Sequence, residues 1–132
     1  MIHLTIVTPI RKLVDRQVDE VVLPGSEGSF GVLPGHAPLL SALQVGEIMY
    51  RQGSEARFVA VAWGFTEVLS DKVSVLADIA ESAEDIDVER AREASERARQ
   101  RLQSGGDDVD WERARVALDK ALVRMSVASK KG

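Results

Sequence analysis

The sequence predicts a chain in two unlike parts, a β-sandwich or β-barrel followed by two helices. All four prolines and five of the six aromatic residues lie before residue 66, and no proline occurs after Pro38. Residues 1–86 carry a net charge of −6, whereas residues 87–132 carry +2. Frequent turn residues are typical of short strands, and their absence favours long helices.

The strands are predicted in three stretches before residue 80. "HLTIVT" (3–8) is rich in β-formers and ends at Pro9, and "VDEVVLP" (18–24) leads into a glycine-rich segment. Residues 46–78 form a meander with turns at Gly53-Ser54 and at 70–72. Turn signals every 8–12 residues indicate a sandwich or a barrel.

The helices are predicted from two similar openings, "DIDVERAR" (85–92) and "DVDWERAR" (108–115). The aspartates are good N-caps, and Gly105-Gly106 separates the two runs as in an antiparallel helical hairpin. Apolar and small residues spaced by threes and fours predict two facing stripes, Val88, Ala91, Ser95, Ala98 and Leu102 on the first helix and Trp111, Ala114, Leu118, Ala121, Leu122 and Met125 on the second. The first stripe buries little area, so we expect a weakly held hairpin that is able to open.

Composition excludes several classes of protein. The chain has 132 residues, a net charge of −4 and no cysteine. The negative charge disfavours general nucleic-acid binding, and the lack of cysteine excludes a disulfide scaffold, a thiol nucleophile and a zinc finger. No apolar run approaches the ~20 residues of a membrane span, and the N-terminus lacks the pattern of a secretory signal.

The glycine-rich stretch "VLPGSEGSFGVLPGHAPLL" (22–40) does not fit a known phosphate-binding loop. Its glycines have the spacing GxxGxxG, and no lysine lies between residues 13 and 71. A P-loop requires GxxxxGK[ST], and a dinucleotide loop requires GxGxxG between a strand and a helix. Turns between short strands and a rigid surface that docks on a partner both remain open.

The residues also offer no argument for an enzyme. His3 and His36 are too few for a metal site, and no nucleophile motif is present. Asp85 and Asp87 fit helix capping better than acid–base catalysis. The basic residues after Asp119, which are Lys120, Arg124, Lys130 and Lys131, form a tail suited to an acidic protein surface.

Four segments resemble the epsilon subunits of bacterial F-type ATP synthases over essentially the whole chain. They are "GSEGSFGVLPGHAPLLSAL" (25–43), "VSVLAD" (73–78), "IDVERA" (86–91) and "DVDWERARVALDKALVRMSVA" (108–128). The resemblance implies a ten-stranded β-sandwich over 1–84 and a two-helix antiparallel hairpin over 85–132. It implies a non-catalytic central-stalk subunit with no required cofactor, peripheral at the cytoplasmic face of the bacterial membrane and touching it only through the complex.

The partners implied by the resemblance are the gamma subunit, the ring of c subunits and, in an extended state, the catalytic beta and alpha subunits. The c-ring would meet the loop through Ser26, Glu27, Ser29 and His36. The extended hairpin would restrain ATP hydrolysis through a basic face made of Arg113, Arg115, Lys120 and Arg124.

The resemblance also implies that ATP is a regulatory ligand of the folded hairpin. The matching motif consists of Ile86, Asp87, Arg90 and Ala91, with Glu81 before it and Arg97, Lys120 and Arg124 supplying polar and positive groups. Two alternatives stay open: a coupling subunit whose hairpin neither binds ATP nor inhibits, and a free-standing nucleotide-sensing module. The coupling ion, H⁺ or Na⁺, also stays open.

Overall fold

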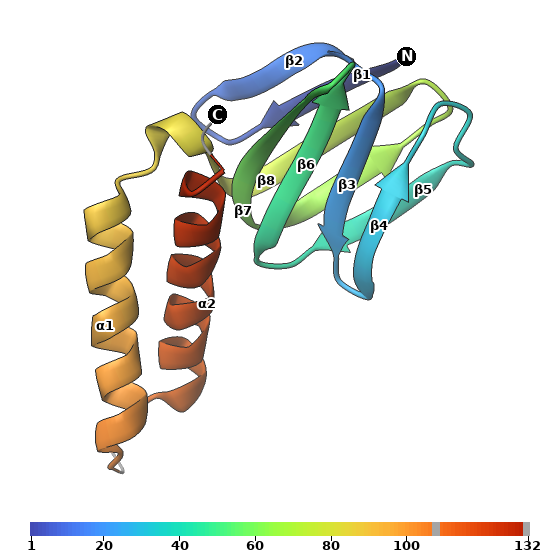
Figure 1. Cartoon of the computed structure of the whole chain (residues 1–132). Helices are drawn as coiled ribbons and strands as arrows, with labels where there is room; N and C mark the ends of the chain where they lie inside the picture. The colour runs from blue at the N-terminus through green and yellow to red at the C-terminus, as the bar shows by residue number, and fades with distance from the viewer. Residues whose placement is uncertain (107–108, 131–132) are drawn as a thin grey trace.

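The computed structural model describes residues 1–106 and 109–130, which form a β-sandwich with a helical hairpin beside it (Figure 1). Asp108, at the predicted opening of the second helical run, and Lys131 of the basic tail lie outside the described residues. The elements are β1 (Ile2–Val7), β2 (Lys12–Val18), β3 (Glu20–Gly25), β4 (Gly28–Val32), β5 (Leu39–Leu43), β6 (Gly46–Gln52), β7 (Glu55–Val68), β8 (Lys72–Ser82), the 3-10 helix η1 (Ala83–Asp85), α1 (Val88–Ser104) and α2 (Trp111–Ala128).

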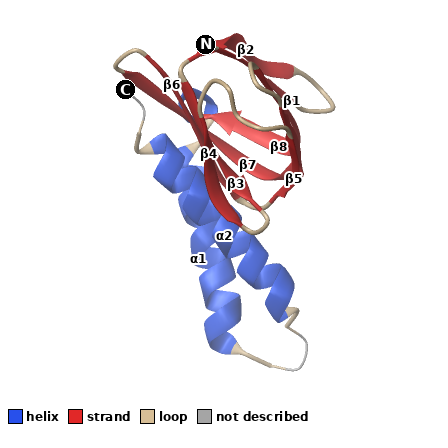
Figure 2. Ribbon diagram, turned by 90° about the vertical axis from the view of Figure 1, so that its right-hand side faces the viewer, coloured by secondary structure: helices blue, strands red, loops and turns tan. Residues whose placement is uncertain are grey.

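The strands are hydrogen-bonded from β2 through to β4 and curve round a shared interior (Figures 1 and 2). β1 lies between its antiparallel neighbour β2 and its parallel neighbour β8, and β8 pairs with β7. β7 then pairs with both β5 and β6, while β3 joins β6 to β4.

The described residues contain eight strands, so the expectation of ten strands was wrong. β7 runs for 14 residues and β8 for 11, and the two stay hydrogen-bonded on both sides of a bend at Trp63 and Gly64. Gly64 allows the bend because its φ is 130° and a Cβ there would overlap the carbonyl oxygen of Leu76. The bend therefore divides neither of the two long strands.

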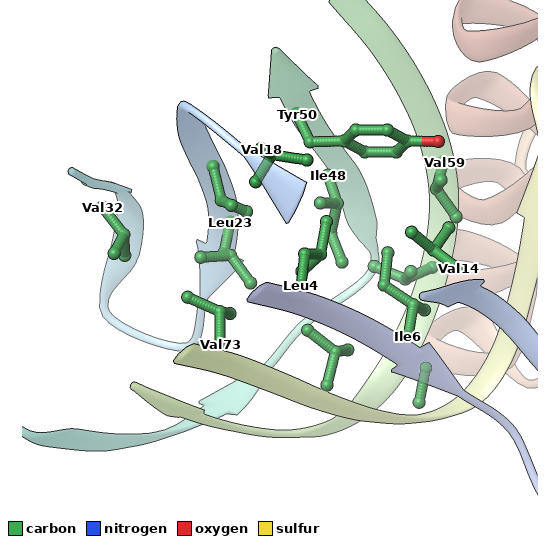
Figure 3. Packing of buried hydrophobic residues seen from close by; sticks show 14 of the residues in the cluster. Leu4, Ile6, Val14, Val18, Leu23, Val32, Ile48, Tyr50, Val59 and Val73 are labelled. Atoms are coloured by element: carbon green, nitrogen blue, oxygen red, sulfur yellow. The ribbon is translucent and has the colours of Figure 1, made fainter. Parts of the chain in front are cut away.

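The core of the sandwich consists of large branched side chains from both layers. Figure 3 shows Leu4 and Ile6 of β1 and Val73 of β8 pointing toward Leu23 of β3 and Ile48 of β6, and each of the five is 0% exposed. Alternation along β1 places every second residue in this core, as expected for a strand with one buried face.

The hairpin begins each helix with an aspartate cap, as the sequence predicts. Asp87 Oδ1 accepts a hydrogen bond from the Arg90 backbone N–H at 3.1 Å, and Asp110 Oδ1 accepts one from that of Arg113 at 3.0 Å. These bonds satisfy backbone donors that have no partner inside the helix.

The seam between the helices is narrower than the predicted stripes. Its buried members on the predicted stripes are small, namely Ala91, Ser95, Ala98, Ala114 and Ala121. Val88, Trp111 and Leu122 are 41–49% exposed, which corrects their predicted inward placement. Helices that approach closely over alanine leave no room for large side chains at the margin of the seam. Within the described residues, no helix is long and apolar enough to cross a membrane.

Candidate functional site

The hairpin contacts the sandwich through α2, which lies between α1 and the sheet (Figure 1). Near the C-terminal end of α2, Val127 and Ala128 pack against Ala60, Ala83 and Ile86, with Phe58 and Val123 at the edge of the cluster. This second core is separate from the sandwich core and consists largely of small side chains. Its burial stabilises the docked hairpin only modestly.

Ion pairs and cation–π contacts extend the interface along α2 and the turn that follows it. Arg124 donates to both carboxylate oxygens of Glu81 on β8, at 2.7 Å from Nε and 3.2 Å from Nη2. Lys130 Nζ lies 2.7 Å from Glu47 Oε1 and 4.7 Å from the centre of the Phe58 ring. Because the side chains in these ion pairs are about one quarter to one third exposed, solvent screens the pairs, although the two-point Arg124 contact also fixes orientation.

A cavity of about 310 Å³ lies between α2, α1 and the sandwich. Most of its lining is apolar, and its charged members are Glu81, Lys120 and Arg124. The remaining lining residues are Val45, Ala60, Val61, Ala62, Ile79, Ala94, Ala117, Ala121 and Val123. An apolar wall with a few converging charges is typical of a site for a compact amphipathic ligand.

Three of the eight residues predicted to bind ATP therefore line this cavity, namely Glu81, Lys120 and Arg124. Ile86 is buried in the small core beneath α2, and Ala91 is buried on α1. Neither residue lines the cavity.

The other three predicted residues lie outside the cavity lining. Asp87 is occupied as the cap of α1. Arg90 and Arg97 are exposed, and Arg97 lines a shallow surface on α1 together with Arg92, Glu93, Glu96 and Gln100. In this arrangement the two arginines and the cavity cations do not form one cluster.

The predicted docking loop is divided by β4. Ser26, Glu27 and Ser29 are exposed at the turn that precedes or opens β4, whereas His36 follows that strand. His36 is half-buried, and its Nδ1 lies 2.6 Å from the carbonyl oxygen of Ala37. The turn residues form one exposed surface, and His36 lies apart from it.

The predicted basic face is divided as well. Arg113 and Arg115 are exposed on α2, whereas Arg124 is paired with Glu81. Lys120 Nζ lies 4.4 Å from the centre of the Trp63 ring on β7. The docked position thus uses half of the basic face to hold α2 against the sandwich.

Sequence reasoning did not identify an exposed apolar surface on the sandwich. Leu40 of β5, Phe65 of β7 and Leu76 of β8 are 57–71% exposed, and Phe65 pairs directly with Leu76. We call these three residues the apolar sheet face. The signal that could have revealed it is Leu76, since it alternates with buried Val75 and Ala77 and so must point outward. Exposed apolar clusters of this kind mark interfaces.

Comparison with known proteins accounts for both parts of the chain. Residues 1–83 match the family described as "ATP synthase, Delta/Epsilon chain, beta-sandwich domain", and residues 84–129 match "ATP synthase, Delta/Epsilon chain, long alpha-helix domain". The chain belongs to the ATP synthase delta/epsilon chain family. It is accordingly an epsilon-type, non-catalytic subunit of an ATP synthase.

About half of the aligned residues are identical in two bacterial relatives, and one of them matches along almost the full length. The ATP synthase epsilon chain of Syntrophobacter fumaroxidans is 51% identical over 129 residues, which cover 98% of this chain and 96% of the relative. The epsilon chain of Koribacter versatilis is 52% identical over 101 residues, covering 76% and 71%. These matches confirm the resemblance to bacterial epsilon subunits.

Solved structures support the same fold. A chain in the cryo-EM structure of Euglena gracilis mitochondrial ATP synthase, with OSCP, F1 and the c-ring, superposes with a TM-score of 0.81 at 26% identity, covering 97% of this chain and 81% of that one. A chain in the central stalk and c-ring of the Tetrahymena thermophila enzyme gives a TM-score of 0.59 at 15% identity, covering 98% and 94%.

Proposed function

We propose that the chain is a central-stalk subunit of a bacterial F-type ATP synthase that helps couple ion flow to ATP synthesis. Its hairpin restrains ATP hydrolysis when extended and binds ATP when docked. The observation that carries this proposal is the thin interface beneath α2, where basic residues of the hairpin hold it against the sandwich. As part of such a complex, the chain would lie at the cytoplasmic face of the membrane.

The sandwich supplies the surfaces for the rest of the stalk. The apolar sheet face, formed by Leu40, Phe65 and Leu76, suits a long-lived protein partner, for which gamma is our candidate. The exposed turn with Ser26, Glu27 and Ser29 is polar and rigidly mounted between β3 and β4, which suits the c-ring loops. The two surfaces allow the sandwich to bridge gamma and the ring.

The hairpin supplies the regulation because two of its cations have two alternative uses. In the docked state Arg124 pairs with Glu81 and Lys120 lies over Trp63. The same side chains cannot at that moment meet an acidic segment of the catalytic subunits. Docking therefore withholds half of the basic face from the catalytic subunits, and extension releases it.

ATP would favour the docked state by binding at the cavity with Lys120 and Arg124. The phosphates would take Lys120 and Arg124 in exchange for their contacts with Trp63 and Glu81, and the alanine and valine walls suit the base. A ligand specific for one state stabilises that state by about 2.7 kcal/mol at a hundredfold excess over Kd, which is enough to shift a thinly held interface.

The regulatory role is tested by ATP hydrolysis in the assembled enzyme, with the full chain and with a chain ending at Ile86. We expect faster hydrolysis without residues 87–132. An unchanged rate of hydrolysis would contradict inhibition, and the remaining function would be that of a coupling subunit without a regulatory hairpin.

ATP binding is tested by titration calorimetry of the full chain. We expect heat with the unmodified chain, less heat after Lys120→Gln plus Arg124→Gln, and unchanged heat for the matched control Arg115→Gln. No heat at millimolar ATP would contradict the proposed ligand.

A further inference from the structure

The backbone at Trp63 is unusual for a large side chain. Its φ is 56°, and it is the one non-glycine residue with a positive φ among residues 1–106 and 109–130. A bulky side chain in this left-handed region is a steric outlier that a glycine would avoid. Such strain persists only where the surrounding structure enforces it, and it often marks a functional position.

Pairing with β8 holds the backbone on both sides of Trp63. Trp63 directly precedes Gly64, whose Cβ-free backbone lies against Leu76 and Ala77 of β8. On both sides of Trp63 the pairing is regular, from Ala62 with Ile79 to Gly64 with Ala77. The strain is thus located where β7 changes direction.

The side chain of Trp63 is turned to the hairpin. Lys120 Nζ lies 4.4 Å from the centre of its ring. Together with Val116, Ala117 and Lys120 of α2, the indole lines a groove of about 480 Å³ that also includes Asp110, Glu112 and Arg113. The other named contacts of the hairpin with the sandwich lie further along the chain, through Arg124 and Val127 of α2 and through Lys130 just after it. Trp63 is therefore the contact that reaches furthest toward the start of α2.

We propose that Trp63 is a strained latch for the hairpin. The sandwich holds the backbone of Trp63 in the left-handed region, so that the face of its indole ring contacts Lys120. This contact keeps the first half of α2 docked. A cation above an indole is attracted by the electron-rich face of the ring. With tryptophan at position 63, the sandwich is less stable than it would be with glycine, but the hairpin is more firmly docked than it would be with glycine. The inference rests on the proposed movement of the hairpin, and its test needs neither ATP nor the assembled synthase.

Because the natural chain has no cysteine, two introduced cysteines can report hairpin position in the full-length protein. Ser54, at the turn between β6 and β7, and Ser104, at the end of α1, are both exposed. Spin labels on Ser54→Cys and Ser104→Cys give the distribution of distances between sandwich and hairpin. Thermal unfolding of the same chains gives the stability of the sandwich.

Trp63→Ala and Trp63→Gly both remove the ring, and only Trp63→Gly also removes the strain. We expect both to raise the undocked population about two- to fivefold, the range that follows from an exposed cation–π contact. We expect Trp63→Gly to unfold at a temperature higher than Trp63→Ala by roughly 4 °C. Lys120→Met should undock the hairpin as Trp63→Ala does, and the double variant should add nothing further.

The matched controls are Phe65→Ala, an exposed aromatic residue two positions along β7, and Arg115→Met, an exposed cation on α2. Both should leave the distances unchanged. Unchanged distances in Trp63→Ala, additive effects in the double variant, or a Trp63→Gly chain no more stable than Trp63→Ala would each overturn the latch. If the latch variants undock while ATP gives no heat and hydrolysis is unaltered, the latch stands and the proposed regulation fails.

Discussion

The sandwich and the hairpin are built from different side chains and therefore hold together with different strength. The sandwich interior consists of branched residues such as Ile2, Leu4 and Ile48, each fully buried. The helix seam buries mainly alanine, such as Ala91 and Ala114. Since stabilisation scales with buried apolar area at ~25 cal/mol per Å², the same number of buried residues contributes far less in the hairpin.

This difference assigns separate roles to the two parts. A firmly packed sandwich keeps its binding surfaces in fixed positions, while a loosely docked hairpin can change position at low cost in free energy. A small apolar cluster, ion pairs and cation–π contacts hold α2 down, and the ion pairs and cation–π contacts are readily exchanged for others.

The largest expected effect is on the sandwich core. Leu4→Ala should lower the free energy of unfolding by about 3 kcal/mol, because it leaves a cavity among fully buried neighbours. Leu122→Ala is the matched change in the hairpin, at a residue that is 41% exposed, and should cost less than about 1 kcal/mol. Urea unfolding measures both changes, and equal losses would remove the contrast between the two parts.

Breaking the Arg124–Glu81 pair should have an intermediate effect, and it should change the free energy of docking without changing the stability of the sandwich. Arg124→Gln should weaken docking of α2 by about 1 kcal/mol, since the pair is bidentate and partly exposed to screening by solvent. Hydrogen exchange of the α2 amides measures the loss, with Arg115→Gln as the control. Loss of protection in β1 as well would show that the hairpin is not an independent unit.

A gain of similar size is expected inside the sandwich at Thr66. Its side chain is fully buried, and its hydroxyl finds no hydrogen-bond partner within the described part of the chain. Thr66→Val keeps the shape and removes the unpaired hydroxyl, so it should raise the free energy of unfolding by about 1 kcal/mol. Thr5→Val, at a half-buried position on β1, is the control and should change stability less. A less stable Thr66→Val chain would mean that the hydroxyl is in use.

The smallest effect is a dependence on pH at the surface of the sandwich. A hydrogen bond from Lys12, together with one from His3, holds the pKa of Asp15 below its usual value of 3.8. A lowered pKa in the folded state contributes stability above pH 3.8 that is lost as the pH falls further. Asp15→Asn should therefore flatten the decline of stability below about pH 4, and thermal unfolding across pH 2.5–6 measures it. An unchanged pH profile would contradict this role for Asp15.

The sequence allowed the local features to be predicted. Pro9 and the glycines located the turns, and Asp87 fits an N-cap because its carboxylate can reach a backbone N–H three residues on. The division into strands and helices follows from the same short-range signals. Each of these features depends only on residues that are close together in the sequence, so it can be predicted without knowing the fold.

The features that were missed depend on contacts between distant residues. Glu81 and Arg124 are 43 positions apart, so their pairing requires the docked hairpin. The left-handed Trp63 has no local signal, since a tryptophan within "VAVAWGF" is typical of an ordinary strand. The count of ten strands fails for a related reason, because whether a bend divides β7 depends on its hydrogen bonds to β8.

Native-state hydrogen exchange of the intact chain tests most directly whether the two parts differ in stability. The amides of β1 and β8 lie in the central hydrogen-bonded ladder, whereas those of α1 and α2 depend on a narrow alanine seam. We predict that the helices open with a free energy several kcal/mol below that of the central strands. A single opening free energy shared by both parts would contradict the account.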